Sequence, residues 1–138
     1  MPTTVKVRAR VAALLDAEPS AEAKAIRQRP LDEKPYWDIE RARIGQSRKV
    51  PVELVVNAYP AARAEIDGDG AFHEVAFDMP VKKSSWIALR VLPSSHTNPV
   101  FVVVGDRSVV EKPLRALNLG EIKVLSIEDV MGPAPVVE

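Results

Sequence analysis

The chain has 138 residues, which fits one domain with a single hydrophobic core, since a domain of this size buries roughly two-thirds of the surface that its unfolded chain exposes. Its 19 basic and 19 acidic side chains cancel, so nucleic acid and anionic membranes, which attract an excess of positive charge, are disfavoured as partners. The absence of cysteine excludes disulfides, thiolate zinc sites and cysteine nucleophiles.

The first segment, residues 5–11, alternates between apolar and basic side chains and predicts a half-buried strand. Lys6, Arg8 and Arg10 also interrupt any signal-peptide core, and no apolar run approaches the ~20 residues that span a bilayer. We therefore expect a soluble chain without an export signal, which would be cytoplasmic if Met1 is the natural start.

A polar connection over residues 17–34 follows the first strand. Ser20 is placed to cap a short helix, and Pro30 forces that helix to end. Beyond it, residues 36–44 predict a strand, residues 45–49 a turn, and residues 52–56 an alternating strand, so the two strands are expected to form a hairpin.

Two further alternating runs, residues 62–66 and 73–79, flank the sequence Asp-Gly-Asp-Gly at residues 67–70. Asp-Gly between alternating runs is the strongest local signal for a hairpin. The same sequence is similar to the start of a calcium loop, but the bidentate Glu needed at its twelfth position is replaced by Asp78, which lies in a predicted strand. The hairpin is the favoured interpretation.

Residues 85–92 predict a strand with Ile87 and Leu89 on one face and Trp86 and Arg90 on the other. After a turn-rich stretch, residues 100–104 are continuously apolar and predict a central strand covered on both faces, although the same run would be an aggregation hazard at an open edge. Beyond Arg107 the pattern loosens; residues 121–127 can supply one more strand.

About seven or eight short strands without a long helical period favour an all-β fold, an immunoglobulin-like antiparallel β-sandwich. We expect a single domain over residues 1–130 and a flexible C-terminal tail over residues 131–138, where Gly and Pro accumulate.

Residues 84–90 (Ser-Ser-Trp-Ile-Ala-Leu-Arg) and 96–102 (His-Thr-Asn-Pro-Val-Phe-Val) carry a family resemblance, together with residues 35–45 and 52–57. They resemble the β-sandwich region that follows the catalytic domain in bacterial metallohydrolases of the CehA/McbA type, within the polymerase-and-histidinol-phosphatase superfamily. The likeness covers roughly residues 5–106, and the sequence departs from it after residue 107. In that family the metal ligands belong to the catalytic domain, so the resemblance implies an accessory module without its enzyme.

No residue set predicts catalysis. His73 and His96 could join Asp67, Asp69 or Glu74 at a metal, but the favoured interpretation is structural: His73 begins a strand, and His96 ties down the following loop by hydrogen bonds. Serine and threonine hydroxyls lie near His96 in the sequence, yet no nucleophile elbow or phosphate-binding glycine motif surrounds them. We therefore expect no catalytic residue, no metal, no cofactor and no enzymatic activity in the isolated chain.

Trp86 and Arg90, with Trp37, are the sharpest binding candidates. On an open sheet face they would form a stacking platform for a sugar ring, a peptide or a partner domain; the alternative is that Trp86 belongs to the core. The full candidate set is Trp86, Arg90, His96, Asn98 and Trp37. The sequence thus predicts an accessory domain that mediates protein–protein or interdomain contacts, with another domain or a second copy as its partner. A small carbohydrate- or peptide-binding module and a fragment of a metal-dependent hydrolase remain as alternatives.

Overall fold

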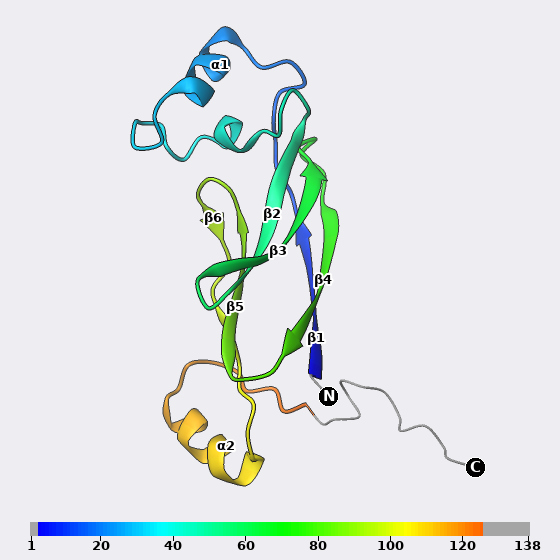
Figure 1. Ribbon diagram of the computed structural model, residues 1–138, viewed down its shortest axis with the longest axis vertical. Helices are drawn as coiled ribbons and strands as arrows, with labels where there is room; N and C mark the ends of the chain where they lie inside the picture. The colour runs from blue at the N-terminus through cyan, green and yellow to red at the C-terminus, as the bar shows by residue number, and fades with distance from the viewer. Residues whose placement is uncertain (1–2, 126–138) are drawn as a thin grey trace, which may run out of the picture.

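The computed structural model describes residues 3–125, and it consists mainly of two antiparallel β-sheets that pack face to face (Figure 1). In one sheet β1 (Thr3–Val11) pairs with β4 (His73–Val81). The other has the order β3 (Tyr59–Asp67), β2 (Lys49–Val56), β5 (Ser85–Val91). Two short strands, β6 (Ser95–His96) and β7 (Val100–Val102), both pair with the remaining side of β5. The predicted all-β sandwich is confirmed at this level.

The core lies between the two sheets and follows the alternation of the sequence. In β4 every second residue is buried, from Val75 through Phe77 to Val81, because successive side chains of a strand point to opposite faces. β2 is buried almost throughout, and Val50 and Val52 are completely inaccessible. The predicted apolar faces of β1, β4 and β5 are therefore confirmed.

The predicted hairpin between residues 62–66 and 73–79 is wrong. β3 pairs with β2, and β4 pairs with β1, so residues 67–70 cross from one sheet to the other. The backbone of this crossing bonds to neighbouring loops: Gly68 N–H donates to the Arg48 carbonyl (2.7 Å), and the Gly68 carbonyl accepts from Leu15 N–H (2.8 Å). The Asp-Gly sequence therefore forms a turn that connects the two sheets, and not a hairpin within one sheet.

The actual hairpin joins β2 to β3 at Asn57 and Ala58, both with positive φ (49° and 75°). Two consecutive residues in this region match the twist of a two-residue antiparallel hairpin. Asparagine tolerates that conformation well, but alanine is unusual there, which hid the turn in the sequence.

The segment before β2 also differs from its prediction. Residues 36–44 hold a single 3₁₀ turn, η1 (Ile39–Ala42), so the predicted strand and its hairpin with residues 52–56 are wrong. Arg41 donates hydrogen bonds to the carbonyls of Pro30 (3.0 Å) and Glu33 (2.8 Å), which folds the segment back on the preceding loop. The predicted short helix is confirmed as α1 (Ala21–Gln28), capped by Ser20 and ended before Pro30.

The last described part of the chain is more open than predicted. Residues 100–104 form a short edge strand and its extension, so the prediction of a covered central strand is wrong. Helix α2 (Arg107–Ala116), capped by Asp106, was not predicted and contains no buried residue. Residues 121–125 hold no strand, while residues 126–127 and the predicted tail over 131–138 lie outside the described residues. Among residues 3–125 no helix is long and apolar enough to cross a membrane.

Candidate functional site

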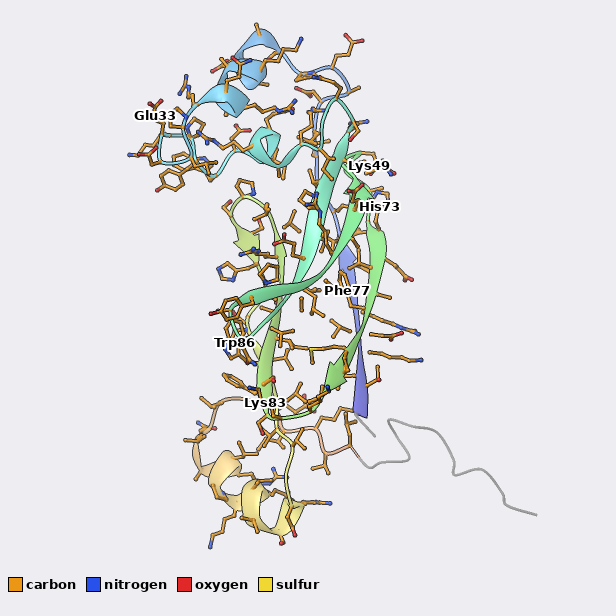
Figure 2. The ribbon with its side chains drawn as sticks, viewed as in Figure 1. Glu33, Lys49, His73, Phe77, Lys83 and Trp86 are labelled. Atoms are coloured by element: carbon orange, nitrogen blue, oxygen red, sulfur yellow. The ribbon has the colours of Figure 1, made fainter. Side chains whose placement is uncertain are left out.

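The outer face of the larger sheet holds the predicted binding residues of β5. Trp86 and Arg90 point away from the core that Ile87 and Leu89 enter, as the alternation predicts. Figure 2 shows Trp86 on the larger sheet, whereas Phe77 lies between the two sheets. Trp86 is half-buried, so one part of the indole is packed while another remains accessible to a partner.

Trp86 is fixed by the tip of the β2–β3 hairpin. The side-chain oxygen of Asn57 accepts from Trp86 N–H (3.1 Å), and Asn57 N–H donates to the Trp86 carbonyl (3.0 Å). On the other side of β5, Trp86 lies directly opposite Phe101 of β7. The two rings border a shallow hollow of about 230 Å³, lined by Asn57, Ser84, Ser85, Trp86, Phe101, Val102 and Val103. This volume is below the ~300 to 1,000 Å³ of typical small-molecule pockets.

Arg90 is already paired. Its Nε lies 2.5 Å from Oε2 of Glu53, the residue opposite it in β2, and Glu53 is largely buried on this outer face. Arg90 also lies four residues beyond Trp86, which in a strand separates the two Cα atoms by about 13 Å. The predicted joint platform of indole and guanidinium is therefore two separate features.

The other candidates lie near the opposite end of β5 from Trp86. His96 is the cross-strand neighbour of Arg90, and its Nδ1 lies 3.1 Å from the Thr97 carbonyl. Asn98 is exposed in the link between β6 and β7. Trp37 packs edge-on against Tyr36, and its carbonyl accepts from Ser94 Oγ at the β5–β6 turn (3.4 Å). The five predicted residues thus divide into Trp86 alone, Arg90 with His96 and Asn98, and Trp37.

An exposed apolar surface beside Trp86 was not predicted from the sequence. Four side chains of residues 100–104 are largely accessible: Val100 at 59%, Phe101 at 58%, Val103 at 42% and Val104 at 52%. We call these four residues together with Trp86 the β7 surface. The uninterrupted apolar run at residues 100–104 was visible in the sequence, but such a run is equally typical of a central strand that is covered on both faces.

The hydroxyl and imidazole groups that the sequence offered as chemical candidates have structural partners. Ser84 Oγ accepts from Val104 N–H (3.0 Å), and Thr97 Oγ1 accepts from Leu89 N–H (3.1 Å). His73 begins β4, as expected, and its Nε2 lies 2.8 Å from Asp69 Oδ1. That hydrogen bond, with a second one from Ala71 N–H, lowers the pKa of Asp69 below its usual value. Within residues 3–125 no three His, Asp or Glu side chains gather as metal ligands would.

Comparison with known proteins gives no match to a family model, to a curated protein or to a solved structure. The function must therefore be inferred from the residues of the chain itself.

Proposed function

We propose that the chain is a non-catalytic accessory domain that contacts another protein domain through the β7 surface. The observation that carries this proposal is the exposure of Phe101 and Val103 on the same sheet face as the half-exposed Trp86, with Val100 and Val104 exposed on the other face of the same edge. Contiguous apolar patches on a soluble domain mark interaction sites more often than scattered single residues do. Aromatic residues in such a patch are the usual energetic centres of an interface.

The gain from covering the patch is substantial. Fully burying a valine or phenylalanine side chain contributes about 1.5 to 3 kcal/mol. Phe101 and Val103, which share the outer face with Trp86, are each about half accessible, so a partner on that face would recover on the order of 1.5 to 3 kcal/mol from them alone. That amount supports a contact with another protein domain.

The strand order supports an immunoglobulin-like assignment for this fold. In immunoglobulin-like sandwiches strand B pairs with E, and strands C′, C, F and G form the facing sheet. The pair β1–β4 matches B–E. In the larger sheet the spatial order β3, β2, β5 and then the β6–β7 edge matches the spatial order C′, C, F and G.

The family resemblance suggests the partner. Residues 84–90 and 96–102, which resemble the accessory region of CehA/McbA-type metallohydrolases, form β5, β6 and β7 and supply most of the β7 surface. We infer that the contact is made with the catalytic domain of such an enzyme.

Calorimetric titration of the chain into an isolated catalytic domain of a CehA/McbA-type metallohydrolase tests the proposal. We expect binding, and a loss of at least about 30-fold in affinity for Phe101→Ser, since truncating a central aromatic residue costs 2 kcal/mol or more. Phe72→Ser is the matched control because Phe72 is also exposed, at 66%, but lies in the crossing between the sheets. No binding, or an equal effect of both substitutions, would refute the proposal.

A further inference from the structure

Besides the two-residue strand β6, four strands of the sandwich have an open edge within residues 3–125: β1, β3, β4 and β7. Natural proteins protect such edges from other chains with charged side chains and proline. Three of these edges carry that protection on their strands, namely Lys6, Arg8 and Arg10 in β1, Arg63 and Glu65 in β3, and Glu74, Asp78 and Pro80 in β4. β7 and its extension, residues 100–104, contain no charge and no proline.

The hydrogen bonds of β5 determine which backbone groups of β7 face this edge. Trp86 uses its N–H and C=O on Asn57, toward β2, so its neighbours Ser85 and Ile87 direct theirs toward β7. Their partners in the ladder are Val102 and Val100. The alternate residues, Phe101 and Val103, therefore direct their backbone groups away from β5, to the open side.

We propose that a second copy of the chain pairs with this edge, β7 against β7 in antiparallel orientation, with the two-fold axis passing through Val102. The proposal rests on the β7 surface being a contact surface, as proposed above, and it names a partner for the open edge of that surface. The outer face of Trp86 remains available to a different domain.

This register satisfies the open backbone groups. Phe101 of one copy lies opposite Val103 of the other, and each such pair exchanges two hydrogen bonds, giving about four across the seam. On the outer face the pairing places an aromatic side chain against a β-branched one, a favourable cross-strand combination. On the inner face Val102 meets its own copy, and Val100 meets Val104.

Charge favours a second copy at β7 over one at β1. A symmetric pairing of β1 would bring Lys6, Arg8 and Arg10 against the same residues of the other copy, and like charges opposite one another destabilise a sheet. Residues 98–105 carry none. A two-fold contact also closes after two copies, so the edge is used up without forming a fibre.

Cysteine crosslinking tests the register directly, because the native chain contains no cysteine. In the proposed dimer the two Val102 Cα atoms are about 4.5 Å apart, within disulfide range. The two Val100 Cα atoms are about 13 Å apart and out of range. We expect Val102→Cys to give a disulfide-linked dimer under mild oxidation and Val100→Cys to remain at least 10-fold less crosslinked. Equal crosslinking of the two variants, or none, would overturn the proposal.

Sedimentation velocity gives a second measurement that needs no substitution of a half-buried residue. A short interface of this kind is weak, with an expected dissociation constant on the order of 100 µM. We expect reversible dimers of the native chain, a shift to monomer for Val103→Lys and native behaviour for Val109→Lys, an exposed valine of α2. A monomer up to about 500 µM, or species larger than a dimer, would refute the second copy at β7. Binding to the metallohydrolase catalytic domain is measured separately, so the failure of one proposal is distinguishable from the failure of the other.

Discussion

Replacing Arg43 with methionine removes the centre of a buried polar network that holds the segment before β2. Its guanidinium forms a bidentate pair with Glu40 (2.6 and 2.7 Å) and donates to the carbonyls of Asp16 (2.7 Å) and Ser47 (3.0 Å). The side chain of Arg43 is 0% exposed and that of Glu40 is 8% exposed. The Arg43 side chain therefore connects three segments: the loop after β1 at Asp16, the 3₁₀ turn η1 and the turn before β2.

The magnitude follows from what the substitution leaves behind. Breaking a buried ion pair by removing one partner costs about 3 to 5 kcal/mol, because the remaining charge has no compensation. In Arg43→Met the Glu40 carboxylate and two carbonyls lose their donor. For a chain of this size we expect a decrease in the unfolding temperature of roughly 10 to 20 °C. The hydrogen bond from Arg43 lowers the pKa of Glu40 below its usual 4.5, so the stability that this carboxylate contributes is present above pH 4.5 and is lost as pH falls through the lowered value.

Urea and thermal unfolding, each followed by circular dichroism at pH 7, measure the loss of unfolding free energy and the decrease in the unfolding temperature. Arg63→Met is the matched control, since Arg63 pairs with Glu65 at 3.9 Å while the two side chains are 51% and 45% exposed; such pairs contribute about 0 to 1 kcal/mol. The double substitution Glu40→Gln with Arg43→Met should recover part of the loss, because no unpaired charge remains. Equal effects of Arg43→Met and Arg63→Met would refute the argument.

Two further predictions concern the crossing between the sheets. In Gly68→Ala the new Cβ would lie 3.1 Å from the Leu15 Cβ, so we expect unfolding free energy to fall by about 1 to 3 kcal/mol in urea titrations, and an unchanged value would contradict the tight packing. The pKa of Asp69 should lie below 3.8 in a carboxyl NMR titration and rise toward that value in His73→Ala, because the His73 hydrogen bond is the largest cause of its lowering; a titration unaffected by the substitution would show that the contact is not formed in solution.

Side-chain alternation predicted the strands that have one face in the core and one in water. In β1, β4 and β5 the difference between the buried and the exposed face is visible in the sequence, since every second residue must be apolar. It also placed Trp86 and Arg90 on the outer face correctly. The pattern fails where the burial of a residue depends on distant partners: residues 36–44 contain aromatic and β-branched side chains, but Arg41 and Arg43 bind carbonyls that are remote in sequence.

Strand pairing was harder to predict than strand location. The Asp-Gly signal at residues 67–70 correctly marks a reversal, yet the strands it joins belong to different sheets. The true hairpin turn contains Ala58 at positive φ. No local sequence pattern predicts that conformation for an alanine. The position of Phe101 opposite Trp86 follows from the register of β5 with β7, which the alternation of a single strand does not specify.

The polar residues of segments 84–90 and 96–102 attach the β6–β7 edge to β5. Thr97 binds both the N–H and the C=O of Leu89, and Ser84 binds Val104. These groups attach the edge formed by β6 and β7 to β5. What the attached edge presents to its surroundings is Phe101 and the adjacent valines, at one fixed register beside Trp86. An edge held in place in this way loses little conformational entropy when it is covered, which supports the proposed role of the β7 surface as a contact surface.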